Sequence, residues 1–126
     1  MAVSHTKRVC QIIKLKPEAE AEYLEIHKAA WPGVLVALSR HNIADYSIHY
    51  YRPLHLLIAN FKYVGHEYEK DMTGIAADPE TRNWWKMTDG MQESFEAGAT
   101  GSGGDVSWWT DLPEVFRFEG AGTQSQ

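Results

Sequence analysis

Apolar and polar residues alternate in three segments of the chain, which is typical of strands with one buried face. These segments are Arg8–Leu15, Ala44–Tyr51 and His55–Val64. Arg52-Pro53 separates the second segment from the third, so these two are predicted to pair as an antiparallel hairpin. The same alternation in E-V-F-R-F-E predicts a final strand at Glu114–Glu119.

Helical segments fill the spaces between these strands. Pro17-Glu18 predicts a helix start, because proline fits the first turn and a carboxylate interacts favourably with the positive end of the helix dipole. This helix is expected to end or kink at Trp31-Pro32, and a second helical stretch to cover Val34–His41. A further helix is predicted at His66–Ala77. The last one begins at Asp78-Pro79-Glu80, where Asp78 can cap it.

The resulting order, β-α-β-β-α-β, is that of the ferredoxin-like protomer in the α+β class. Helices cover one face of such a sheet and leave the other bare, so we expect a homodimer. The length of 126 residues is that of a single domain, 1–126, with an ordered core at about 7–119. Ala97–Gly104 has the composition of a loop, and Gly120–Gln126 that of a loose tail.

Charge and cysteine content narrow the class of protein. Twelve Lys and Arg against seventeen Asp and Glu give a net charge of −5, which argues against a nucleic acid as partner. No apolar run approaches the roughly 20 residues of a membrane span, so no membrane partner is expected. Cys10 is the single cysteine and Met1–Lys7 lacks a signal-peptide core, which favours a cytoplasmic protein.

The aromatic residues form the most unusual feature of the composition. Four of the five tryptophans form two adjacent pairs, Trp84-Trp85 and Trp108-Trp109. Neighbouring side chains on a helix diverge by about 100°, so one helix stripe cannot bury both. One tryptophan of each pair should therefore face a partner subunit, a loop or a ligand.

Sequence motifs for metal or phosphate binding are incomplete. His66–Lys70 begins like the zinc motif H-E-x-x-H but ends in lysine. The glycines of Ala97–Gly104 precede Asp105-Val106-Ser107 instead of the Gly-Lys-Ser/Thr of a phosphate loop. The six histidines show no repeated ligand spacing. No metal site and no cofactor are expected.

Tyr23 and His27 are four residues apart and share the inward face of the first helix. By themselves, these two residues also fit a purely structural role, in which the tyrosine fills the core and the histidine forms a hydrogen bond with a backbone carbonyl. Trp31 extends the same face, Tyr46 lies on the neighbouring strand, and Trp84-Trp85 comes from the other long helix. Aromatic rings with a few hydroxyl and imidazole groups suit a pyranose, whose C–H face stacks on a ring while its hydroxyls form hydrogen bonds.

These motifs together resemble the L-rhamnose mutarotase family. The resemblance covers Arg8 to Phe118, and its motifs stand in family order. They are Y-x-x-x-H-x-x-x-W-P at Tyr23–Pro32, N-I-A-D-Y-S-I at Asn42–Ile48, W-W-K-M-T-D at Trp84–Asp89, and E-V-F at Glu114–Phe116. The resemblance implies a dimeric α+β barrel that interconverts the α and β anomers of a monosaccharide without a metal or organic cofactor.

The resemblance also assigns roles to individual residues. His27 matches the family's proton-donating histidine. The substrate-binding residues are expected to be Tyr23, Tyr46, Trp84 and Trp85, with Trp31 as a possible further pocket residue. The glycine-rich segment and Trp108-Trp109 look more like a branch of the family that acts on L-fucose. The expected substrate is therefore a 6-deoxy-L-hexose, either L-rhamnose or L-fucose.

The chemistry of mutarotation agrees with these residue types. Opening the cyclic hemiacetal moves a proton from the anomeric hydroxyl and one to the ring oxygen, and imidazole can exchange protons at neutral pH. Two other classes share this fold: cofactor-free monooxygenases and haem-binding proteins. A non-catalytic sugar-sensing module is a third alternative.

Overall fold

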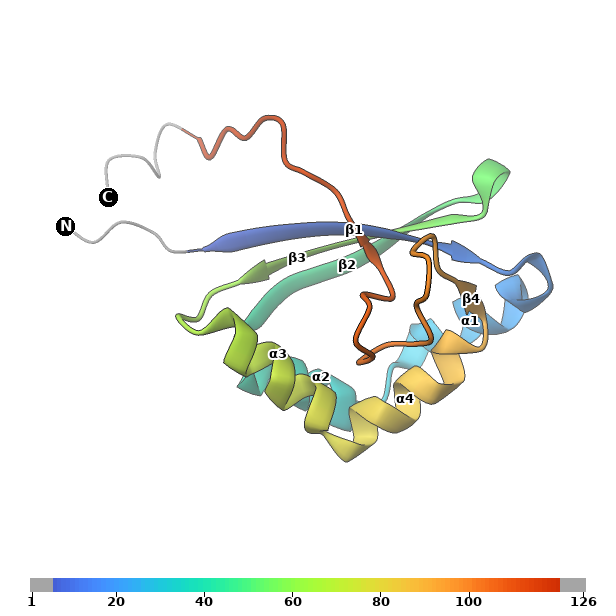
Figure 1. Cartoon of the computed structure of the whole chain (residues 1–126), viewed down its shortest axis with the longest axis horizontal. Helices are drawn as coiled ribbons and strands as arrows, with labels where there is room; N and C mark the ends of the chain where they lie inside the picture. Colours follow the sequence, from blue (N-terminus) through green and yellow to red (C-terminus); the bar gives the residue numbers. More distant parts are fainter. Residues whose placement is uncertain (1–5, 121–126) are drawn as a thin grey trace.

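A computed structural model describes residues 6–120 of the chain (Figure 1). Three long strands form the centre of an antiparallel sheet: β1 (Lys7–Leu15), β2 (Ile43–Tyr51) and β3 (Leu56–Tyr63). Two short strands, β4 (Gln92–Glu93) and β5 (Thr110–Asp111), both pair with β1, and the strand order is β2-β3-β1-β4. The three long strands and the hairpin between β2 and β3 were predicted from the sequence.

The helices lie on one face of this sheet (Figure 1). They are α1 (Glu20–Ile26), α2 (Pro32–Arg40), α3 (Tyr68–Ala77) and α4 (Pro79–Asp89), and short 3₁₀ turns occupy Pro17–Ala19, His27–Ala29 and Arg52–Leu54. Pro32 and Pro79 each stand in the first turn of a helix, where the missing N–H costs no hydrogen bond. The side chain of Asp78 accepts a hydrogen bond from the Thr81 backbone N–H at 2.9 Å, so the predicted cap of α4 is present.

Several predicted boundaries differ from the observed ones by a few residues, and two of them have a clear local setting. The first helix, expected to run on to Trp31-Pro32, becomes a 3₁₀ turn at His27. The helix predicted from His66 begins at Tyr68 as α3, and the Glu67 backbone N–H just before it donates to the Tyr63 hydroxyl at 3.0 Å.

The core lies between the helices and the inner face of the sheet. Alternate residues of β1 and β3 point into it and are buried, and they are opposite one another in the register, as in the pair Ile13 and Leu57. Tyr23 of α1 and Met91 pack into the same cluster. The outward residues of the same strands, such as Ile12 and its cross-strand neighbour Ile58, are only partly buried.

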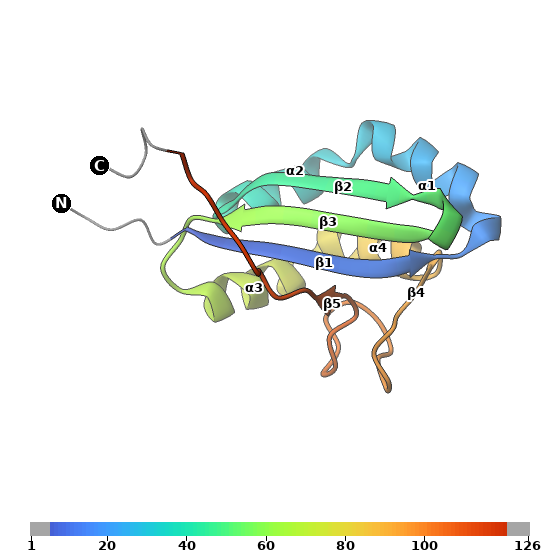
Figure 2. The same ribbon diagram turned by 90° about the horizontal axis from the view of Figure 1, so that it is seen from above.

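The strand predicted at Glu114–Glu119 is absent from this structure, and the prediction was wrong for the protomer. The backbone N–H of Leu112 still donates to the Cys10 carbonyl at 2.8 Å, but Pro113 has no N–H to continue the ladder. Beyond Pro113 the chain separates from β1 and runs on the side of the sheet away from the helices (Figures 1 and 2). Its apolar side chains are exposed: Val115 by 93%, Phe116 by 81% and Phe118 by 68%. The predicted tail after Gly120 lies outside the described residues.

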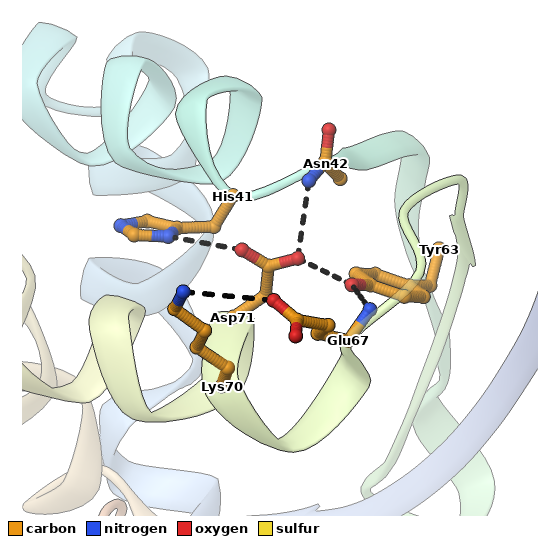
Figure 3. Close-up of polar contacts among 6 residues, drawn as sticks. All are labelled: His41, Asn42, Tyr63, Glu67, Lys70 and Asp71. Carbon is orange, nitrogen blue, oxygen red and sulfur yellow. Dashed lines mark hydrogen bonds and ion pairs between the residues drawn. The ribbon is translucent and has the colours of Figure 1, made fainter.

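A carboxylate fixes α3 against its neighbours (Figure 3). Asp71 accepts hydrogen bonds from the Tyr63 hydroxyl and from Asn42 Nδ2 at 3.0 Å, and His41 Nδ1 lies 3.4 Å from its other oxygen. These bonds, led by that from Tyr63, lower the pKa of Asp71 below its usual value. Asp71 therefore joins the end of α2, the end of β3 and the first turn of α3, and it holds α3 in place over the sheet. Within residues 6–120, no helix has the length and apolar character needed to cross a bilayer.

Candidate active site

A cavity of about 510 Å³ lies between the inner face of the sheet and the helices. This volume is within the range of small-molecule sites and leaves room for a hexose. Aromatic side chains from three parts of the chain form much of its wall: Phe61 and Tyr68, Trp84 and Trp85, and Trp108 and Trp109. Polar groups on the wall are few, and they include His27, Tyr46 and Gln11.

His27 lies at the point where α1 passes into a 3₁₀ turn. Its Nδ1 is 2.8 Å from the backbone carbonyl oxygen of Tyr23. A carbonyl oxygen only accepts hydrogen bonds, so Nδ1 carries the proton and the Nε2 lone pair is left available. Burial lowers the pKa of His27, and the bond to the Tyr23 carbonyl opposes that shift only in part. At neutral pH the imidazole is therefore uncharged and able to accept a proton at Nε2.

Aromatic rings hold this imidazole on two sides. The Tyr23 ring stacks on it, with the ring centroids 4.1 Å apart and the planes at 28°. Trp84 meets it edge-on at 5.2 Å, and Trp31 meets Trp84 in the same way at 5.2 Å. The imidazole is thus fixed in orientation by packed neighbours, which is a requirement for a group that exchanges protons with a bound ligand.

Tyr46 reaches the cavity because β2 contains an irregularity. Ala44 pairs with Lys62 and Ser47 with Asn60, so one extra residue stands in β2 between these pairs, and Asp45 has a left-handed φ of 51°. The bulge changes the phase of the strand, so that Ile43 before it and Tyr46 after it both line the cavity. Tyr46 stacks on Phe61 at 5.5 Å but keeps 42% of its surface accessible, because it faces the cavity. Desolvation raises the pKa of Tyr46 to about 12, so its hydroxyl keeps its proton at neutral pH.

The structure brings together most of the residues singled out in the sequence. His27, Tyr46, Trp84 and Trp85 all line the same cavity. Tyr23 lies behind His27, with 3% of its surface exposed, and Trp31 lies behind Trp84. Neither Tyr23 nor Trp31 is among the side chains that line the cavity.

Both adjacent pairs of tryptophans line the cavity. Trp108-Trp109 and the glycine-rich segment close the cavity on the side of β1 and α4. Ser102 anchors this segment, because its backbone N–H and its hydroxyl donate to the Asp89 carboxylate at 2.8 and 2.7 Å. Gly103 has a φ of 80°, and a Cβ there would lie 3.3 Å from Trp85, so glycine suits both the backbone and the close approach.

Sequence reasoning missed Gln92. Its amide nitrogen donates to the Tyr23 hydroxyl at 3.2 Å, and its amide oxygen accepts from Trp108 Nε1 at 2.9 Å. Gln92 belongs to a two-residue strand with no hydrophobic period, so nothing in its neighbourhood in the sequence marked it. Among residues 6–120, no three side chains of His, Cys, Asp or Glu gather in a way that could hold a metal ion.

The cavity is of the kind that binds a small molecule, and comparison with known proteins gives the family. A family model described as L-rhamnose mutarotase matches residues 8–118. The L-rhamnose mutarotase of Phocaeicola vulgatus is 34% identical over 83% of this chain and 91% of its own length. That of Bacteroides thetaiotaomicron is 31% identical over 90% of this chain and 99% of its own.

A solved structure is similar in fold. The crystal structure of an L-rhamnose mutarotase from Formosa agariphila aligns with a TM-score of 0.69 and 22% identity, covering 90% of this chain and 99% of the other. The ferredoxin-like α+β class predicted from the element order is confirmed. The chain belongs to the L-rhamnose mutarotase family, whose members are isomerases that interconvert the anomers of a sugar.

Proposed function

We propose that this protein interconverts the α and β anomers of L-rhamnose, a 6-deoxy-L-hexose, and that His27 moves the proton. The observation that carries the proposal is an uncharged imidazole fixed on the wall of an aromatic cavity of the size of a sugar site. The names of the curated relatives support L-rhamnose as the sugar.

A single imidazole suffices for the proton transfers. The anomeric oxygen and the ring oxygen are bonded to the same carbon, so one group can reach both. In the proposed reaction His27 Nε2 takes the proton of the anomeric hydroxyl, the bond from the anomeric carbon to the ring oxygen breaks, and the same proton passes to the ring oxygen. The open aldehyde rotates, and the reverse steps close the ring on its other face. No atom is gained or lost, and no redox step occurs.

The remaining wall residues position the sugar in this proposal. Trp84 and Trp85 offer ring faces for the C–H face of the pyranose, and Tyr46 offers a hydroxyl that stays protonated. Tyr23 and Trp31 support His27 and Trp84 from behind. We further propose a cytoplasmic location, which the single cysteine of the sequence favours.

The pH dependence of anomer exchange tests this function. Saturation transfer between the H1 signals of the two anomers should give a rate for L-rhamnose that is constant from pH 8 to about 6.5, and then falls as His27 protonates, because its pKa is lowered from the usual value near 6.5. The free energy of unfolding should fall over the same acidic range, since the unfolded chain there binds the proton more readily. L-Fucose is expected to exchange more slowly than L-rhamnose.

Two outcomes would contradict this account. A rate that rises on acidification below pH 6.5 would mean that the charged imidazole is the active form. Sugar binding without faster exchange would make the protein a sugar-sensing module.

We also infer that the protein forms a homodimer through the face of the sheet that the helices leave open. Ile12 and Ile58 lie opposite each other on that face, and the chain after β5 runs on the same side of the sheet (Figure 1). This last segment exposes the apolar side chains of Val115, Phe116 and Phe118. Apolar surface of this kind is a common mark of an interface between copies.

Light scattering after gel filtration tests the homodimer. The expected mass is about twice the 14.3 kDa of one chain, and Ile58→Lys should shift the protein to one chain, since a charge would be buried in the interface. Wild-type protein that stays a monomer at high concentration would contradict the inference.

A further inference from the structure

A polar residue interrupts the apolar inner face of β1. Val9 and Ile13 point into the protein and are buried, and Gln11 stands between them at the same phase of the strand. Gln11 lines the cavity, and its neighbour across the sheet on β3 is the fully buried Ala59. A polar side chain among such neighbours costs free energy unless it forms hydrogen bonds, so the partners of this amide show what it can do.

Asp111 of the short strand β5 fixes the orientation of the Gln11 amide. The two residues are opposite each other in the register of β1 and β5, and Gln11 Nε2 donates to Asp111 Oδ1 at 2.8 Å. A carboxylate only accepts hydrogen bonds, so the amide must turn its nitrogen toward Asp111 and its oxygen away from it. Within residues 6–120, the Gln11 amide oxygen accepts no hydrogen bond. A residue on the cavity wall therefore carries an acceptor that the protein itself does not use.

Tyr68 adds a hydrogen-bond donor to the same part of the cavity. Its side chain lines the cavity, and its phenol is close enough to the Asp111 carboxylate for that charge to act on it. Burial, together with this negative charge, raises the pKa of Tyr68, so the phenol keeps its proton at neutral pH. An acceptor on Gln11 and a donor on Tyr68 suit a sugar hydroxyl, which both donates and accepts.

The Gln11 amide reaches the cavity from a different side than the His27 imidazole. Seen from above, α1 lies toward β2, and β5 lies beyond β1 at the other edge of the sheet (Figure 2). His27 directly follows α1, whereas Gln11 faces Asp111 of β5. A pyranose whose anomeric carbon lies at His27 turns the opposite side of its ring toward Gln11. In a six-membered ring, C4 is the carbon opposite the anomeric carbon.

We propose that Gln11 is a specificity-determining residue that accepts a hydrogen bond from the C4 hydroxyl of the sugar, and that Asp111 is the positioning residue that holds its amide. This inference rests on the proposed mutarotase function and deepens it. The C4 hydroxyl is equatorial in L-rhamnose and axial in L-fucose. An acceptor held in one place therefore distinguishes the two sugars, because only one of them presents its hydroxyl in the right direction.

Gln11→Leu removes the acceptor with little change in volume. We expect kcat/KM for the anomer exchange of L-rhamnose to fall by about fivefold to fiftyfold, mainly through KM, because the bound hydroxyl loses its partner. The preference for L-rhamnose over L-fucose should weaken by a similar factor. With 4-deoxy-L-rhamnose, which lacks the hydroxyl, the variant should stay within about twofold of wild type. Equal losses with L-rhamnose and 4-deoxy-L-rhamnose would overturn the inference, since they would show a purely structural effect.

Asp111→Asn tests the positioning role. An asparagine amide both donates and accepts, so it no longer holds the Gln11 amide in a single orientation. The KM for L-rhamnose should rise about twofold to tenfold with kcat kept, and 4-deoxy-L-rhamnose should show no such rise. The double variant Gln11→Leu/Asp111→Asn should stay within about twofold of Gln11→Leu, because both changes act on the same contact. Losses that add in the double variant would contradict a positioning role.

Thr110→Val is the matched control on the same short strand. The Thr110 hydroxyl donates to Glu96 at 2.6 Å, and neither residue lines the cavity. This variant should keep kcat and KM within about twofold of wild type for both sugars. A rise in KM as large as that of Asp111→Asn would mean that any change in β5 disturbs the cavity, and would overturn the assignment of Asp111.

The NMR signals of the Gln11 side-chain amide separate this inference from the proposed function. They should shift when L-rhamnose is added to wild-type protein, and shift much less with 4-deoxy-L-rhamnose. Wild-type protein that shows these shifts but exchanges no anomers would contradict the proposed function and leave the contact with Gln11 supported. Wild-type protein that exchanges L-rhamnose while the Gln11 signals stay unmoved would overturn the inference and leave the function supported.

Discussion

Replacing His27 with alanine should slow the exchange of L-rhamnose anomers by about 10²–10⁴-fold, the usual contribution of a well-placed acid–base group. The reason is that Nε2 is the uncharged proton acceptor on the cavity wall, held by the bond from Nδ1 to the Tyr23 carbonyl. The rate is measured by saturation transfer at pH 7.5, with circular dichroism to check that the variant is folded.

His66→Ala provides the matched control for this prediction. His66 is an exposed histidine in the turn before α3 and is not among the residues that line the cavity. Its removal should leave the exchange rate within about twofold of wild type. A folded His27→Ala variant with the same rate as His66→Ala would show that the proton passes through another group.

Trp84→Ala should lower the free energy of unfolding by about 3–5 kcal/mol, as large-to-small changes at buried aromatic positions do. Trp84 is only 7% exposed and meets both His27 and Trp31 edge-on. Its loss opens space beside the imidazole, so exchange should also slow. Urea unfolding of wild type and variant gives the difference in stability.

Trp85→Ala separates the two roles of the pair. Trp85 is less buried than Trp84 and faces the cavity and Gly103. We expect its removal to cost less than half as much stability as the loss of Trp84, and to raise the KM for L-rhamnose. Equal losses of stability for the two variants would mean that both rings act mainly as packed core residues and that Trp85 has no separate role at the cavity.

Most of the fold followed from local signals in the sequence. Alternation placed the long strands, and prolines marked the starts of α2 and α4 because each fits a first helical turn. The prediction of a final strand at Glu114–Glu119 was wrong for a physical reason. Alternation reports that one face of a segment is apolar, but not whether a sheet edge within the protomer can receive it. Pro113 has no N–H to continue the ladder on β1, and after it the segment with Phe116 pairs with no strand of the protomer.

Only those parts of the site could be predicted that residue spacing on a helix or the family resemblance indicates. A separation of four residues on one helix predicted that Tyr23 and His27 would lie together, and they stack. It could not tell which of the two lines the cavity, because that depends on how α1 packs against the sheet and α4. Gln92 could not be predicted from local patterns, because its two hydrogen-bond partners are 16 and 69 residues away in the chain.

The central claim is that this protein opens and closes the ring of a 6-deoxy sugar. Its most direct test is saturation transfer on L-rhamnose at neutral pH with the wild-type protein. The account predicts transfer between the two H1 signals that grows in proportion to protein concentration. Spectra that match those of the sugar alone at every protein concentration would contradict it.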